Sequence, residues 1–122
     1  MNRAAPTPRP RAGMLSLRID LPSGRLGPGK IALLEAIDRE GSISAAGRAL
    51  GMSYKRAWDL VDALNKLAGT PVVDASPGGY RGGGAVLTDA GRSLIADYRA
   101  IERAASRAAE PRLEALIKRT RA

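Results

Sequence analysis

The sequence predicts a mainly α fold with a small β wing, arranged as a winged helix-turn-helix with a long C-terminal dimerisation helix. Residues 44–50 and 53–67 each carry apolar residues at helical spacing, and Gly51 lies between the two segments. Two short apolar runs then flank a glycine-rich loop. An apolar pattern with seven-residue spacing follows them, which is typical of a helix that packs on another helix.

The chain before the first helix is expected to hold a basic arm and one strand. Residues 1–13 combine three prolines with three arginines and no acidic residue, a composition that predicts disorder. Apolar and polar residues alternate over 15–21, the period of a half-buried strand, and a turn follows at 22–24. This strand would join either the wing sheet or the edge of a partner chain.

Three helices with short connections should then form a compact core. Pro28 suits the first position of a helix and Gly41 suits its C-terminal stop. Ser44 is the preferred N-cap of the second helix, which Gly51 ends by adopting a left-handed conformation. Ser53 caps the third helix. The apolar face of that third helix consists of Ala57, Leu60, Val61, Leu64 and Leu67.

The period changes after the third helix, where we predict the wing. Val72 and Val73 form one strand and residues 85–87 form the other, and the loop between them contains five glycines. Such a loop lets the backbone approach a ligand closely and carries Tyr80 and Arg81 at its centre. The competing interpretation is a nucleotide-binding loop, but no Lys followed by Ser or Thr comes after the glycines.

The C-terminal segment 88–122 is predicted to be a dimerisation helix with a basic tail, and 14–87 to be the winged domain. Thr88 should cap the helix, and Pro111 should interrupt it. The seam that would pair two copies of the chain contains Leu94, Tyr98, Ile101, Ala105 and Ala108. Packing of this seam on its own domain is the alternative.

Composition narrows the function. Twenty Lys and Arg against twelve Asp and Glu leave a net charge of +8, which favours nucleic acid as the partner. The chain has no Cys and no His, so the commonest general base, the thiol nucleophile and the usual zinc ligands are missing. We therefore expect no enzyme, no cofactor and no metal site. No run of about 20 apolar residues is present to span a bilayer, and we expect a cytoplasmic, nucleoid-associated protein.

A helix-turn-helix with a basic first turn predicts binding to double-stranded DNA through the major groove. The residues expected to contact DNA are Ser44, Ser53, Tyr54, Lys55, Arg56, Asp59, Tyr80 and Arg81. Asp59 would hold Lys55 or Arg56 in place or accept a hydrogen bond from cytosine. Trp58 is assigned to core packing rather than to a base contact.

Four alternatives stay open. The helix pair could be an ordinary helical hairpin with a solvated charged face. A non-specific, nucleoid-type DNA-binding protein would use the same charge without reading bases. The basic arm would either contact the DNA backbone or remain a solvated tail. The fourth alternative is an enzyme or a small-molecule binder, but the acidic residues are scattered singly along the sequence.

The chain from about residue 15 to 109 resembles the N-terminal domain of the ModE family of molybdate-responsive transcription regulators. The resemblance rests on Gly-Ser-Ile-Ser at 41–44, Gly-Met-Ser-Tyr-Lys-Arg-Ala-Trp at 51–58 and Gly-Gly-Gly-Ala-Val-Leu-Thr at 82–88. LysR-type regulators share some of these features more loosely. The resemblance implies a winged helix-turn-helix that dimerises through its flanking helices and binds a palindromic operator, commonly near genes of molybdate transport or molybdenum cofactor synthesis.

The family members that sense molybdate carry a pair of small oxyanion-binding domains after this region. The sequence ends at Ala122 without them. We therefore expect that this chain alone does not bind molybdate.

Overall fold

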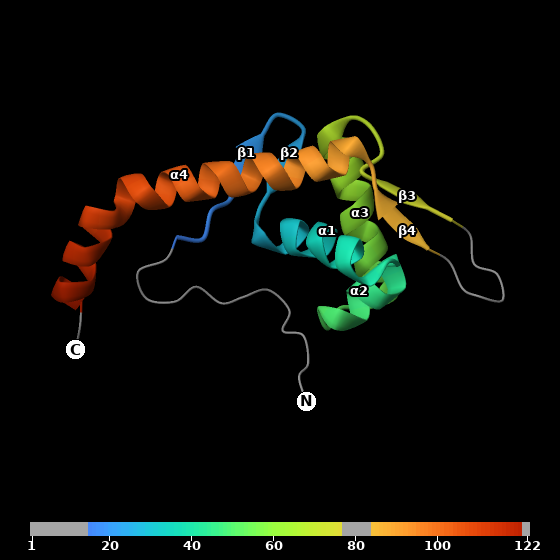
Figure 1. Cartoon of the computed structure of the whole chain (residues 1–122), viewed down its shortest axis with the longest axis horizontal. Coiled ribbons are helices and arrows are strands. Elements are labelled where there is room, and N and C mark those ends of the chain that lie inside the picture. Colours follow the sequence, from blue (N-terminus) through green and yellow to red (C-terminus); the bar gives the residue numbers. More distant parts are fainter. Residues whose placement is uncertain (1–14, 77–83, 121–122) are drawn as a thin grey trace.

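The computed structural model describes residues 15–76 and 84–120, and Figure 1 shows their arrangement. The described elements are, in chain order, β1 (Ile19–Leu21), β2 (Gly24–Leu26), α1 (Pro28–Glu40), α2 (Ile43–Ala49), α3 (Tyr54–Ala68), β3 (Val73–Ala75), β4 (Ala85–Leu87) and α4 (Asp89–Thr120). The predicted class, mainly α with a small wing and a long C-terminal helix, is confirmed.

Helix α1 forms the centre of the core. It contacts α2, α3, β4 and α4, and α4 runs above it in Figure 1. The fully buried large side chains are Ile31, Leu33, Leu34, Ile37, Val61, Leu64, Val72 and Tyr98, which come from α1, α3, the segment before β3, and α4. Because every one of these elements contributes to a single cluster, the three helices, the wing strands and the start of α4 form one packed body.

Local sequence explains where the first two helices begin and end. Pro28 occupies the start of α1, and Gly41 ends it in the left-handed region at φ +80°. The prediction that Ser44 caps α2 is wrong. Ser42 is the N-cap, because its extended backbone lets its hydroxyl oxygen accept the N–H of Ala45 at 3.0 Å. Ser44 lies within the first turn of α2.

The wing is the antiparallel pair β3–β4, in which Val73 lies opposite Leu87. These two residues are buried, whereas the cross-strand pair Asp74 and Val86 points to solvent. The amide of Ala85 also donates a hydrogen bond to the carbonyl oxygen of Gly41 at 2.8 Å, which ties the wing to the end of α1. Residues 77–83 lie outside the described ranges.

The N-terminal strand has a different partner from either of those we predicted. Residues 15, 17 and 19 are half-buried and their neighbours are exposed, so the predicted alternation is confirmed. Strand β1 pairs with β2 in a separate hairpin, with Ile19 opposite Leu26, rather than with the wing or a partner edge. Residues 22 and 23 form the turn, and Gly24, the first residue of β2, follows it at φ +153°, a conformation that favours glycine. Pairing with the next segment also closes a shorter loop than pairing with the wing would.

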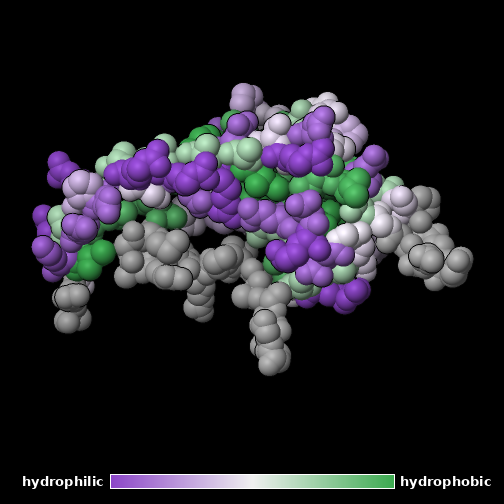
Figure 2. All heavy atoms as spheres, viewed as in Figure 1, coloured by the Kyte–Doolittle hydropathy of each residue, from purple (hydrophilic) through white to green (hydrophobic). Residues whose placement is uncertain are grey.

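Helix α4 runs from Asp89 to Thr120 and contains Pro111, so the prediction that Pro111 interrupts the helix is wrong. A proline removes one N–H donor, and the chain can absorb its ring as a bend instead of ending the helix. Figure 1 shows α4 turning in its C-terminal part. Figure 2 shows hydrophilic side chains along much of α4 on this face of the molecule. Within the described ranges, no helix combines the length and apolar character needed to cross a membrane.

Candidate nucleic-acid interface

Helices α2 and α3 form the predicted helix-turn-helix, and Gly51 makes the turn between them. Gly51 lies in the left-handed region at φ +71°, and the amide of Met52 donates to the carbonyl oxygen of Gly47 at 2.9 Å. A Cβ on Gly47 would lie 3.3 Å from the Cβ of Ala57, which is tighter than an ordinary carbon contact. The two helices therefore cross as closely as small residues allow.

Ser53 fixes the start of α3. Its hydroxyl oxygen accepts the backbone N–H of Arg56 at 3.0 Å, as its predicted role as N-cap requires. The other N–H groups at the start of the first turn have no intrahelical partner, as at the beginning of any helix. The first turn of α3 thus presents a partial positive charge at its tip.

The side chains at this tip are exposed. Tyr54 is 62% exposed, and Lys55 and Arg56 are also exposed. The opposite face of α3 buries Ala57 and Val61 in the core. The amphipathic pattern read from the sequence is therefore confirmed, and its polar side projects two cations and a phenol hydroxyl into solvent.

Asp59 pairs with Lys55 and not with Arg56. The Lys55 ammonium donates to the Asp59 carboxylate at 3.0 Å, with both side chains largely exposed. In the part of the chain that the structure describes, the guanidinium of Arg56 makes no ion pair. Arg56 is therefore the cation of the first turn that has no ion pair among the described residues, whereas the charge of Lys55 is balanced by Asp59.

Trp58 packs partly against the core, as predicted. Its ring meets that of Tyr54 edge to face, with 6.3 Å between the centroids and 75° between the planes. Such aromatic pairs restrict the orientation of both rings. Trp58 is thus the aromatic neighbour of Tyr54 on α3.

Sequence reasoning missed Arg48. This exposed residue of α2 donates through Nη1 to the hydroxyl oxygen of Ser44 at 3.1 Å. The signal was present, because Ser44 and Arg48 are four residues apart on a helix and therefore adjacent on its surface. Ser44 and Arg48 form a second exposed polar pair on the helix-turn-helix. Tyr80 and Arg81, the predicted wing contacts, lie outside the described residues.

The predicted dimerisation seam divides along α4. Leu94 is half-buried against the core, and Tyr98 has no exposed surface. This corrects the seam at Tyr98, because a side chain enclosed by its own domain has no surface to offer a second chain. Ile101 is 47% exposed, Ala105 is half-buried and Ala108 is exposed. For these three residues dimerisation stays a prediction.

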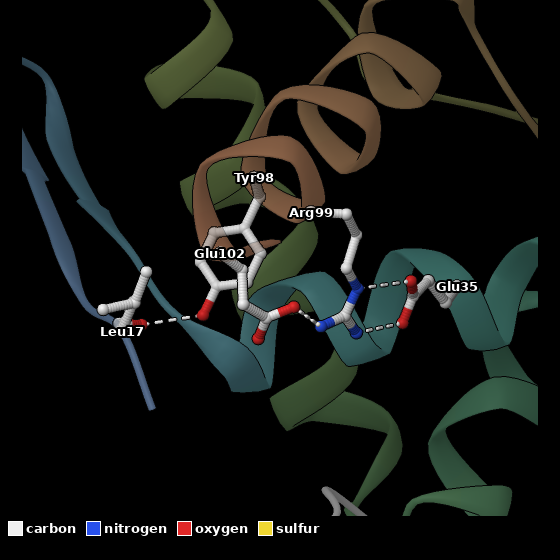
Figure 3. A network of polar contacts seen from close by, with 5 residues as sticks. All are labelled: Leu17, Glu35, Tyr98, Arg99 and Glu102. Carbon is white, nitrogen blue, oxygen red and sulfur yellow. Dashed lines mark hydrogen bonds and ion pairs between the residues drawn. The ribbon is translucent and has the colours of Figure 1, made fainter. Parts of the chain in front are cut away.

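A polar network that the sequence did not predict lies where α4 crosses α1 (Figure 3). Arg99 donates to both carboxylate oxygens of Glu35, at 3.0 and 2.7 Å, and to Glu102 at 2.8 Å. The hydrogen bonds with Glu35 are the main reason that the pKa of Arg99 is raised above its ordinary value. An arginine is charged at any ordinary pH, and this charge is paired with two acids of the same protein.

No group of three or more His, Cys, Asp or Glu suited to a metal ion occurs in residues 15–76 and 84–120. The two described acids that do come together, Glu35 and Glu102, share the guanidinium of Arg99, and Asp59 pairs with Lys55. The exposed surface of α2 and α3 therefore offers hydrogen-bond donors and cations rather than metal ligands.

Comparison with known proteins gives the context of this surface. The sequence model described as bacterial regulatory helix-turn-helix protein, lysR family, matches residues 29–92. That range begins in α1 and ends in the first turn of α4, so it contains the helix-turn-helix and the wing.

Individual relatives cover a similar region. The chain is 63% identical over 78 residues to the molybdenum-pterin-binding protein MopB of Rhodobacter capsulatus, covering 64% of this chain and 29% of MopB. It is 53% identical over 73 residues to the molybdenum transport protein ModE of Azotobacter vinelandii, covering 60% of this chain and 27% of ModE. The matched region thus spans less than a third of either relative.

A solved structure extends the likeness to three dimensions. The crystal structure of the CbnR_DBD-DNA complex is similar with a TM-score of 0.56 and 25% sequence identity, covering 71% of this chain and 94% of the other. The arrangement of helices and wing therefore recurs in a chain whose structure was determined together with DNA.

Proposed function

Because the chain belongs to the lysR family of bacterial regulatory helix-turn-helix proteins, we propose that it is a sequence-specific DNA-binding regulator of transcription that acts as a homodimer. Each subunit places the first turn of α3 in one major groove. The half-sites of the operator then lie about one helical turn apart, or a small multiple of it.

The observation that supports this proposal most directly is the exposed tip of α3. Ser53 caps the helix while Lys55 and Arg56 extend into solvent, so backbone amides and cations share one surface. Backbone amides at a helix start suit phosphates, and arginine suits the two acceptors on the edge of guanine. We assign Arg56 to a base because its guanidinium has no ion pair among the described residues.

The surrounding residues have supporting roles in this proposal. Ser44 and Arg48 on α2 contact the phosphate backbone beside the groove, and Tyr54 fixes the register of α3. Asp59 holds Lys55 in position, and it accepts a hydrogen bond from cytosine where the operator has that base. Tyr80 and Arg81 extend the contact from the wing to the sugar-phosphate backbone. The excess of basic residues, +8 in the whole chain, adds sequence-independent attraction.

The names of the relatives suggest where to find the operator. MopB and ModE are named for molybdenum-pterin binding and molybdenum transport, so we propose upstream regions of molybdenum-handling genes as the first fragments to test. A regulator of such genes acts on chromosomal DNA, which places it in the cytoplasm.

The test compares affinities at one fixed salt concentration. The purified protein is titrated with fluorescent duplexes that carry either a candidate operator, selected by sequencing the genomic fragments it retains, or the same bases in shuffled order. We expect the operator to bind about 10³-fold or more tightly. A ratio near one contradicts sequence-specific regulation and supports the nucleoid-type alternative.

A further inference from the structure

The network around Arg99 joins two helices with directional bonds (Figure 3). Glu35 belongs to α1, and Arg99 and Glu102 belong to α4. Nε of Arg99 donates to one carboxylate oxygen of Glu35 and Nη2 donates to the other, so the guanidinium and the carboxylate meet as two planar forks. The side chains of Arg99 and Glu35 are only 33% and 34% exposed. A partly buried, two-point contact fixes orientation far better than a solvent-exposed ion pair does.

A second bond fixes the same turn of α4. The hydroxyl of Tyr98 donates to the carbonyl oxygen of Leu17 at 2.7 Å. Neighbouring residues on a helix point in directions about 100° apart, so Tyr98 and Arg99 hold α4 from two sides. Together the two contacts restrict both the tilt of α4 and its rotation about its own axis.

This turn is where α4 leaves the body. Beyond Glu102, no side chain of α4 makes a hydrogen bond or ion pair with another element among the described residues. Helix α4 nevertheless continues to Thr120, and Figure 1 shows this part extending away from α1 and α3. Whatever this free part binds is therefore connected to the helix-turn-helix through the turn that holds Tyr98 and Arg99.

The free part is long enough for a small tilt to matter. Thr120 lies 18 positions after Glu102, which corresponds to roughly 27 Å measured along the helix axis and slightly less from end to end because the helix bends. A tilt of about 10° at Glu102 moves the far end by about 5 Å, which exceeds the spacing of about 3.4 Å between successive base pairs. The angle of α4 thus has to be fixed within a few degrees if two copies are to meet two half-sites in one register.

We propose that Arg99 is a positioning residue that sets the spacing of the DNA half-sites the protein accepts, by fixing the angle between α4 and the helix-turn-helix. This inference rests on the proposed function, in which two copies pair through the free part of α4. Arg99 does not touch DNA in this proposal. It acts through Glu35 and Glu102, which hold the start of the free helix against α1.

The experiment measures affinity for a series of operators whose two half-sites are moved apart or together by one to three base pairs. The wild-type protein should prefer one spacing. Its affinity should fall about tenfold, or about 1.4 kcal/mol, at each other spacing. Arg99→Ala should flatten this profile and leave the affinity for a single half-site unchanged. Arg99→Lys should be intermediate, because an ammonium cannot form the two-point contact.

An exchanged pair separates positioning from general damage. In the double variant Glu35→Arg with Arg99→Glu, the cation moves to α1 and two acids remain on α4, so the link between the helices is kept. The spacing preference should return. Destabilisation alone would weaken binding at every spacing equally and would not be rescued by the exchange.

Two results would overturn the inference. The first is a folded Arg99→Ala protein whose spacing profile matches that of the wild type, which contradicts the positioning role and leaves the proposed function intact. The second is a wild-type protein with no preference for any half-site, which contradicts the proposed function itself. The single half-site measurement distinguishes the two.

Discussion

The hydroxyl of Tyr98 in α4 donates a hydrogen bond of 2.7 Å to the backbone carbonyl oxygen of Leu17, 81 residues earlier in the chain. Tyr98 is fully buried, so this bond satisfies the one polar atom of a side chain that otherwise serves the core. It also anchors the segment before β1 to the long helix. The chain entering the N-terminal hairpin is therefore joined directly to α4.

Replacing Tyr98 by Phe tests that anchor. The ring is kept and the bond is lost, which leaves the carbonyl of Leu17 without its donor. We expect Tyr98→Phe to lower the free energy of unfolding by about 1 kcal/mol. Urea denaturation followed by circular dichroism measures it. Tyr54→Phe is the matched control, because Tyr54 is 62% exposed and should change stability little.

The burial of Tyr98 also leads us to expect a lower free energy of unfolding at high pH. Burial raises the pKa of Tyr98 above its ordinary value of 10.0. Above pH 10 the folded protein therefore keeps a proton that the unfolded chain releases, so the free energy of unfolding falls as the pH rises. We expect this fall to be steeper in the wild type than in Tyr98→Phe between pH 9.5 and 11, taken as roughly the titration range of tyrosine. Equal slopes for the two proteins would contradict it.

Gly91 marks a close contact between α4 and the segment before β3. A Cβ at Gly91 would overlap the carbonyl oxygen of Val72, which is backbone and cannot rotate away. We expect Gly91→Ala to destabilise the protein by about 1–3 kcal/mol. Gly29→Ala is the control, because a Cβ there has nothing within 4 Å and alanine favours a helix. Thermal unfolding should separate the variants clearly, and a Gly91→Ala protein as stable as Gly29→Ala would refute the contact.

Ser53 allows the helix cap to be separated from DNA binding. Ser53→Ala removes the acceptor for the N–H of Arg56 and should cost about 1 kcal/mol of stability. Ser53→Asp restores a cap acceptor but adds a negative charge where the proposal places phosphates. We expect the aspartate variant to unfold like the wild type and to bind every DNA sequence more weakly. Undiminished binding by a folded Ser53→Asp protein would place the phosphates elsewhere.

Arg56 and Arg48 should behave differently on DNA. If Arg56 hydrogen-bonds to a guanine, Arg56→Ala should weaken the free energy of operator binding by about 1–3 kcal/mol. It should also remove the base preference at one position of the operator. Arg48→Ala removes a proposed phosphate contact, so it should weaken operator and shuffled DNA alike and lower the salt dependence. Binding assays on all single-base variants of the operator distinguish the two patterns. An unchanged base preference in Arg56→Ala removes this residue from base recognition.

The sequence by itself determined the elements that depend on neighbouring residues. Gly41 and Gly51 end their helices in the left-handed region, Ser53 caps α3, and the apolar face of α3 is buried. Each of these outcomes follows from backbone conformation or from side-chain periodicity within a few residues. The winged helix-turn-helix could therefore be predicted, and so could the exposed cations of its third helix.

Only the tertiary structure decided which of several chemically similar residues forms a given contact. Ser42 rather than Ser44 caps α2, because the cap depends on the extended backbone at the end of the α1–α2 connection. The seven-residue spacing correctly predicted an apolar helix face that includes Tyr98. Periodicity does not show which surface covers that face, and Tyr98 is covered by its own domain. Glu35 and Arg99 are 64 residues apart, and only the crossing of α1 and α4 brings them together. Long-range contacts of this kind depend on the angle between whole helices, which no local pattern encodes.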